Sequence, residues 1–237
     1  MLLTDDVYCL IQIKRCHGEL QMSLRKIIYA GALSAVLTYG TSHVLAQVAP
    51  QYPYLSISEA NKTSPLLGTT TSEKSLTTNF GAKNVKHQTV HVAEGETADG
   101  TVIYPNDAKR RVSFIWKDAK KRDVVEVIRL EDKPSLWHLP NQITTGTTLV
   151  QLEKLNGKPF KLSGFDWDYG GNVLSWNGGK LESLLKSKSG KFSATLSLAP
   201  LGTNTPEELI GDREILSSNA KMRKLNPVVA VVNILAP

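Results

Sequence analysis

Residues 164–176 hold the densest set of side chains in the chain that could do chemistry. A pair of carboxylates such as Asp166 and Asp168 can act in general acid–base catalysis or bind a calcium ion. Aromatic rings beside such a pair can stack on a sugar ring. The candidate binding residues of this segment are Asp166, Trp167, Asp168, Tyr169 and Trp176.

The glycine pair within this segment predicts how these side chains are arranged. Gly170-Gly171 stands between two strand-like stretches and predicts a two-residue hairpin turn. The resulting register pairs Tyr169 with Asn172, Trp167 with Leu174, and Phe165 with Trp176. We expect this aromatic face to be buried in the core, and Asp166 and Asp168 to be solvated turn acids on the other face. A sugar-stacking surface, or a catalytic carboxylate pair, is the alternative interpretation.

Neither this segment nor the histidines predict a metal site. Asp-x-Asp followed by Gly-Gly matches half of a calcium loop, because Asn177 stands where that loop needs a bidentate glutamate. His87 and His91 have the spacing of a helical metal pair, but their neighbours alternate as in a strand, on which four residues span about 13 Å. His138 has no serine or acid nearby at a recognisable nucleophile spacing. We expect no metal and no cofactor.

The N-terminal residues predict export. Residues 22–26 are a short basic start, 27–39 are an apolar stretch too short for a comfortable membrane span, and 44–46 read as a cleavage site. We expect cleavage after Ala46, with a retained membrane helix as the alternative. The next residue is Gln47 rather than Cys, which argues against a lipid anchor. Residues 1–21 are interpreted as a start-site extension, and 47–66 as an extended lead-in.

Composition and charge exclude several classes of protein. The 237 residues are 41% hydrophobic and 21% charged, which excludes a disordered chain and a simple coiled coil. The net charge of +6 favours loose attraction to anionic surfaces without specifying nucleic acid. Basic runs at 109–111 and 117–122 are interpreted as solvated hairpin ends, with contact to anionic envelope lipids or an acidic partner as the functional alternative. Both cysteines precede Ala46, so the mature chain has no thiol nucleophile.

The rest of the chain predicts an α+β fold, mostly β, in which two tandem units share one core. Units 67–140 and 141–200 each begin with threonines and a short helix that ends at a glycine, followed by antiparallel strands. Thr148 with Gln151 predicts a capping box in the second unit, and Thr70 with Glu73 predicts one in the first. Residues 201–237 add a helix that starts at 205–208 and a closing strand at 228–235.

The repeated arrangement of helix, glycine and strands resembles a known class of exported bacterial modules. It is similar to the β-lactamase inhibitor protein and to the small lipoprotein of the outer-membrane barrel assembly machinery. The resemblance rests on residues 147–160 and, more weakly, on 69–85. The chain departs from the lipoprotein because it lacks the lipid-bearing cysteine. The resemblance implies an architecture, and a fold alone does not imply a function.

The sequence favours a binding protein over an enzyme. Gly-x-Ser-x-Gly, His-Glu-x-x-His and phosphate-loop motifs are all absent. We expect an exported, periplasmic or secreted, non-catalytic binding or envelope-scaffold protein. Its expected partner is another envelope protein or an anionic envelope component, not nucleic acid, and no permanent membrane anchor is expected. The alternative is a hydrolase or carbohydrate-binding protein of the envelope that uses residues 164–176.

Overall fold

A computed structural model describes residues 12–16, 19–23, 71–92, 95–131, 134–186 and 192–236. The chain divides into two compact units, Met1–Gln47 and Val48–Pro237. In the first unit, β1 (Gln12–Cys16) and β2 (Glu19–Ser23) form an antiparallel hairpin in which Ile13 pairs with Met22. The predicted leader beyond Ser23, its cleavage site and the lead-in at 47–66 lie outside the described residues.

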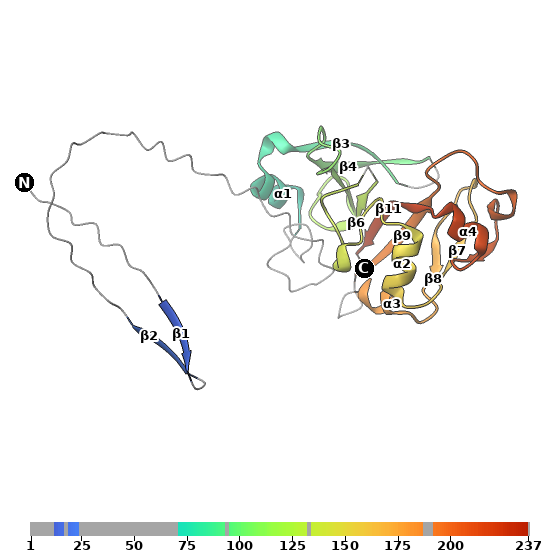
Figure 1. Ribbon diagram of the computed structural model, residues 1–237. Coiled ribbons are helices and arrows are strands. Elements are labelled where there is room, and N and C mark those ends of the chain that lie inside the picture. Colours follow the sequence, from blue (N-terminus) through green and yellow to red (C-terminus); the bar gives the residue numbers. More distant parts are fainter. Residues whose placement is uncertain are drawn as a thin grey trace, which may run out of the picture. The chain divides into compact units, whose positions relative to one another are not determined.

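The described part of the second unit contains nine strands and four short α-helices, drawn in Figure 1. The larger sheet has six antiparallel strands in the order β3-β4-β5-β6-β11-β9. In that order they are β3 (Val85–His91), β4 (Thr97–Ile103), β5 (Val112–Trp116), β6 (Val125–Leu130), β11 (Val228–Leu235) and β9 (Ser193–Ala199). The smaller sheet has the order β10-β7-β8, with β10 (Glu214–Leu216), β7 (Lys161–Ser163) and β8 (Val173–Ser175).

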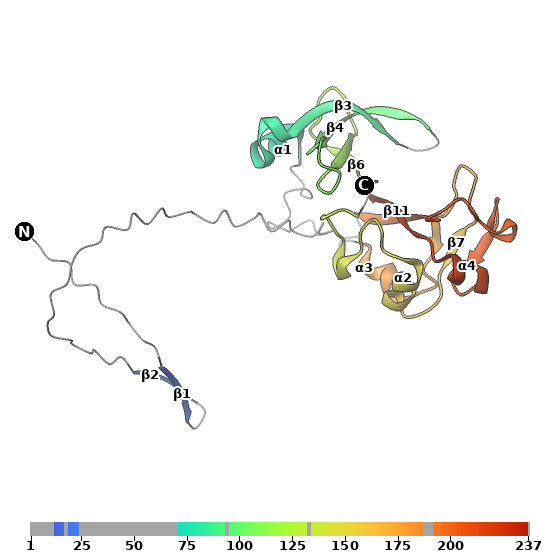
Figure 2. The same cartoon turned by 45° about the horizontal axis from the view of Figure 1, so that its top comes forward.

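Short helices join and flank these strands (Figure 2). The α-helices are α1 (Glu73–Phe80), α2 (Leu149–Asn156), α3 (Lys180–Leu184) and α4 (Ala220–Leu225). The 3-10 helices are η1 (Ala82–Asn84), η2 (Pro140–Gln142) and η3 (Glu207–Leu209). The α-helix expected to start at 205–208 is therefore wrong in type, since η3 is a single 3-10 turn. The closing strand at 228–235 is confirmed.

A main hydrophobic core and a small second cluster lie in the described part of the second unit, and the α+β, mostly β prediction is confirmed. Strand β11, from the last segment of the chain, lies between β6 and β9 and pairs with both. The core accordingly gathers side chains from Leu76 in α1 to Ile234 in β11. The alternation of residues 112–116 predicts a half-buried strand. Strand β5 occupies these residues but is buried on both faces, because Phe114 and Trp116 join this core while Ile115 joins a small second cluster with Val90.

The two helix starts show one confirmed and one wrong prediction. Helix α2 begins at the capping box of Thr148 and Gln151, and ends at Gly157 in the left-handed conformation with φ 81° and ψ 0°. Helix α1 is capped by Ser72, whose hydroxyl accepts from the backbone N–H of Ser75, and not by Thr70 and Glu73. Ser75 supplies the reciprocal bond, which leaves the Glu73 carboxylate for other partners.

Gly157→Ala is expected to lower the free energy of unfolding by about 1–2 kcal/mol, the cost of a Cβ in the left-handed region. Space does not add to this cost, since the nearest atom to an added Cβ is Cε of Lys180, at 3.8 Å. Urea denaturation measures the change. An unchanged midpoint would show that the helix does not depend on this conformation.

Candidate functional site

The segment between β7 and β8 forms a loop in place of the expected hairpin extension. Strand β7 pairs with β8 only through Lys161 with Ser175 and Leu162 with Val173, with an irregularity between the two pairs. The predicted pairs of Tyr169 with Asn172, Trp167 with Leu174, and Phe165 with Trp176 are therefore wrong. We call residues 164–172 the aspartate–aromatic loop.

The loop leaves the sheet because its first residues pair with a distant part of the chain. Gly164 N donates to Arg213 O at 2.9 Å, and Phe165 N donates to Leu209 O at 2.7 Å. Gly211 N donates back to Phe165 O at 2.9 Å, and Phe165 and Ile210 form a parallel bridge. These bonds occupy the backbone groups that the predicted hairpin would have used, so the chain turns away from β8 after Ser163.

The predicted burial of Phe165, Trp167, Leu174 and Trp176 is correct for one residue, partly correct for two and wrong for one. Phe165 is 2% exposed and belongs to the core. Trp176 is half-buried and packs against Phe160, with ring centroids 5.0 Å apart. Trp167 is also half-buried, while Leu174 is 50% exposed because the irregularity in the β7–β8 pairing turns it outward.

Hydrogen bonds within the loop hold its shape. The indole Nε1 of Trp167 donates to Gly164 O at 3.0 Å, and Gly171 N donates to the same oxygen at 3.0 Å. The hydroxyl of Ser163 donates to Tyr169 O and accepts from Asn172 N. Asp166 adopts a positive φ of 60°, a conformation that aspartate tolerates better than most residues. The loop is therefore preorganised, which lowers the entropic cost of binding a ligand.

Two aromatic rings and two carboxylates form the outer surface of this loop. The rings of Trp167 and Tyr169 meet edge to face, with centroids 5.5 Å apart, and Tyr169 is 51% exposed. Asp166 and Asp168 are exposed, as expected, and within the described ranges neither side chain has a hydrogen-bond or ion-pair partner. The structure thus brings four of the five predicted residues together. Trp176 packs against Phe160 instead and does not share a stacking surface with Trp167.

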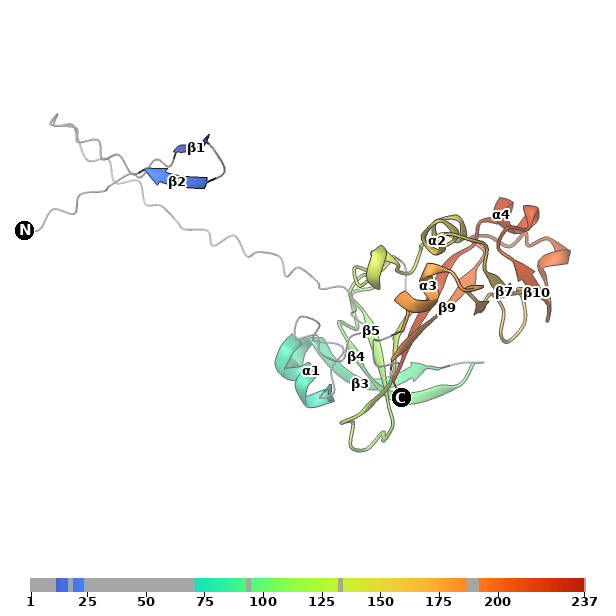
Figure 3. The same cartoon turned by 90° about the horizontal axis from the view of Figure 1, so that it is seen from below.

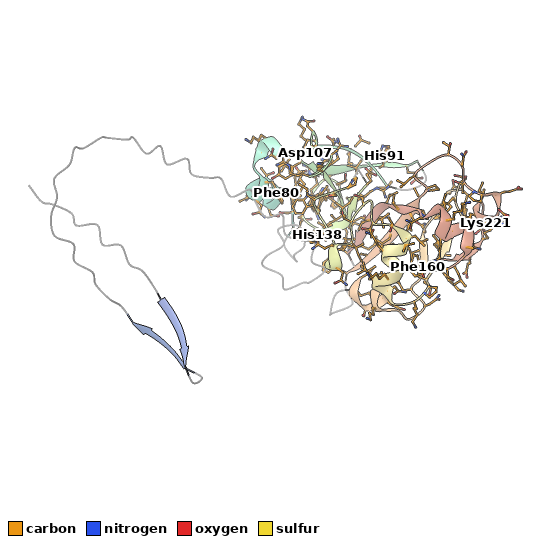
Figure 4. All side chains as sticks on the ribbon, viewed as in Figure 1. Phe80, His91, Asp107, His138, Phe160 and Lys221 are labelled. Atoms are coloured by element: carbon orange, nitrogen blue, oxygen red, sulfur yellow. The ribbon has the colours of Figure 1, made fainter. Side chains whose placement is uncertain are left out.

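His91 and His138, which Figure 4 labels, come from β3 and from the segment before η2 rather than from this loop, and His87 also belongs to β3. His87 and His91 are exposed on β3, in agreement with the expectation of surface positions. His138 is half-buried, and its Nδ1 lies 3.1 Å from Leu139 O. Over the described ranges, no group of three or more His, Cys, Asp or Glu side chains could hold a metal ion.

A polar cluster around Glu73 escaped the sequence analysis. The Glu73 carboxylate accepts from the Thr101 hydroxyl and lies 3.0 Å from Arg122 Nε and 3.6 Å from His87 Nδ1. Trp116 Nε1 donates to the same Thr101 hydroxyl at 2.9 Å. Five separate segments meet here, namely α1, β3, β4, β5 and the loop between β5 and β6, so no local motif could have revealed the cluster. Glu73 serves to fasten α1 to the sheet, since its backbone N–H also bonds Arg122 O.

Some arginines of the basic runs at 109–111 and 117–122 make contacts within the protein. They bracket β5 as expected, and the guanidinium of Arg110 lies 4.5 Å from the ring centroid of Tyr104. Arg110 also hydrogen-bonds Asp107, and this bond lowers the pKa of Asp107. Arg122 pairs with Glu73. The runs therefore do not form one uncommitted cationic surface.

A groove of about 440 Å³ lies along β10, and one of its lining residues, Arg213, accepts a backbone hydrogen bond from Gly164 of the loop. Its lining residues are Glu208, Arg213, Glu214, Ile215, Leu216, Ser218 and Asn219. Glu208 and Lys221 form an ion pair beside it, and the hydrogen bond from Lys221 lowers the pKa of Glu208. Figure 3 shows β10 and β7 side by side at this end of the unit. We call this cavity the β10 groove.

Comparisons with known protein families, curated proteins and solved structures found no match. The resemblance to exported bacterial modules therefore stays a prediction. In the described ranges, no helix is long and apolar enough to cross a membrane.

Proposed function

We propose that this protein is a non-catalytic carbohydrate-binding protein and that the aspartate–aromatic loop is its binding surface. The observation that carries the proposal is the pairing of Trp167 and Tyr169 on a preorganised loop, with two unpaired carboxylates beside them. A half-exposed tyrosine fixed by a neighbouring ring offers a flat face at low conformational cost.

The chemistry of the loop matches the surface of a sugar ring. The C–H groups of a pyranose face can pack on an aromatic ring, and the sugar hydroxyls can donate hydrogen bonds to carboxylates, which are acceptors only. Asp166 and Asp168 provide such acceptors, and they directly precede and follow Trp167 in the sequence. Two negative charges also oppose an anionic ligand at this surface, so a neutral saccharide is the favoured ligand.

The same carboxylates support binding better than hydrolysis. Glycosidases place two carboxyl groups on either side of the scissile bond, one with a raised pKa. Asp166 and Asp168 instead stand two residues apart in one loop, and both are exposed. Each is therefore surrounded by water, which screens it from the other. We accordingly propose recognition without turnover.

Export is the proposed setting of this function, on the basis of the signal pattern at 22–46 and the lead-in that follows it. We expect the intact mass of the protein recovered from the periplasm or medium of a bacterial host to begin at Gln47. A mature product that retains Met22 would contradict this part of the proposal.

Tyr169→Ala is expected to reduce saccharide binding about two- to tenfold, because stacking on one ring contributes roughly 0.5–1.5 kcal/mol. Its free energy of unfolding should change little, since half of the side chain is exposed. Isothermal titration calorimetry with neutral oligosaccharides of the cello, chito and malto series measures the binding, and urea denaturation measures the stability.

Matched variants separate a binding role from a general surface effect. Asp166→Asn and Asp168→Asn should weaken binding, whereas Asp123→Asn, at an exposed acid before β6, should not. Val124→Ala removes another half-exposed apolar side chain, and it should bind as the wild type does. Wild-type protein that binds none of the three series, or binding that survives Tyr169→Ala, would exclude the loop as a carbohydrate site.

A further inference from the structure

The β10 groove is a cavity that the proposed stacking surface does not use. Its lining includes Ile215 and Leu216 of β10 and polar residues from before and after that strand. Over the described part of the chain, β10 pairs with β7 alone, so its other edge is not paired with a strand. A volume of about 440 Å³ falls within the range of small-molecule clefts, about 300–1,000 Å³.

The groove and the loop are joined by direct hydrogen bonds. Trp167 Nε1 donates to Gly164 O at 3.0 Å, and Gly164 N donates to the backbone oxygen of Arg213 at 2.9 Å. The side chain of Arg213 lines the groove. Two hydrogen bonds thus connect Trp167, through Gly164, to the backbone of Arg213, a residue that lines the groove.

The two carboxylates that line the groove are paired with lysines of the protein. Glu208 pairs with Lys221, and the Glu214 carboxylate lies 2.8 Å from Lys161 Nζ. Among the described residues, the Arg213 side chain donates one long bond of 3.4 Å, from Nη1 to Glu208 O, which leaves most of its guanidinium N–H groups for a ligand. A wall of paired charges, hydroxyl, amide and guanidinium groups suits a neutral ligand with many hydroxyls.

We infer that the aspartate–aromatic loop and the β10 groove form one extended site for a neutral oligosaccharide. This inference rests on the proposed function, because the loop supplies the first subsite. One sugar unit stacks on Tyr169 and Trp167. The following units lie along β10, where Arg213 and Ser218 hydrogen-bond their hydroxyl groups. The ligand is therefore a chain of sugars rather than a monosaccharide.

The test compares chain lengths and groove variants by calorimetry, with saccharides of one to six units from the three series named above. In the best-binding series, the wild type should bind the longest saccharide at least about tenfold more tightly than the single sugar. Arg213→Ala should abolish this gain while leaving the affinity for the single sugar unchanged. Ser218→Leu, which fills the groove at an exposed position, should do the same.

Arg223→Ala is the matched control, because Arg223 is an exposed arginine of α4 that pairs with Glu153 and does not line the groove. It should retain the full gain with chain length. Equal affinity for one sugar and for six, or a gain that survives both groove variants, would overturn the extended site while the stacking surface stands. Failure of the wild type to bind any saccharide would overturn the proposed function as well.

Discussion

Trp137→Ala is expected to lower the free energy of unfolding by about 3–5 kcal/mol, as truncation of a buried tryptophan does. The side chain is 0% exposed and lies in the main core. Its ring meets Phe80 of α1 edge to face, with centroids 6.1 Å apart, and its Nε1 donates to Arg110 O at 2.8 Å. The variant leaves a cavity and removes the donor for that oxygen, and both effects destabilise the fold.

Urea and thermal denaturation measure this loss of stability. One further variant separates the effect of the ring volume from that of the indole N–H, and another serves as a control. Trp137→Phe keeps most of the ring volume and removes the indole N–H, so it should cost about 1–3 kcal/mol. Leu136→Ala is the neighbouring control, since Leu136 is 47% exposed, and it should change stability little. A Trp137→Ala protein as stable as the Leu136→Ala protein would show that this tryptophan is not central to the core.

The sequence pattern predicted those elements that are stabilised by local signals. Strand β5 occupies the five predicted residues, because its apolar side chains alternate between two buried clusters. Helix α2 starts at its capping box and ends at Gly157, since both signals act within one helical turn. In these elements the residues that decide the structure are neighbours along the chain.

The errors occur where a distant segment competes for the same backbone groups. The hairpin predicted at 164–176 is shortened because Gly164 and Phe165 bond residues 209–213. Helix α1 takes Ser72 as its cap, and Glu73 is drawn to Thr101 and Arg122 from the adjoining sheet. Neither contact leaves a trace in the local sequence. The exposed positions of Asp166 and Asp168 were nevertheless foreseen, because charged residues beside a glycine pair favour solvent.

The groove could not have been predicted from residues 208–219 alone. This segment has no strong periodicity, and β10 has only three residues. The groove exists because β7 holds β10 from one side while Glu208 and Lys221 meet beside it. The residues of the loop are therefore predictable from the sequence, whereas the groove follows from the pairing of two distant segments.

Gly171→Ala is expected to cost about 2–5 kcal/mol and to abolish saccharide binding, because Gly171 fixes the loop against β9. Its φ is 72°, so a Cβ alone costs about 1–2 kcal/mol. The added Cβ would lie 1.9 Å from Leu198 O. Relief of that clash has to disturb the bond from Leu198 N to Gly171 O, now 2.9 Å, and an unsatisfied buried group costs about 1–3 kcal/mol more.

Gly157→Ala is the control for this variant, since Gly157 has a similar φ of 81° without a close neighbour. The difference between the two variants in urea denaturation isolates the contact with Leu198. We expect Gly171→Ala to be the less stable and to lose binding of the single sugar and of the longer saccharides together, because Tyr169 and Asp168 move with the loop. If Gly171→Ala matches Gly157→Ala in stability and still binds saccharide like the wild type, the loop is not held by β9, and its proposed preorganisation is wrong.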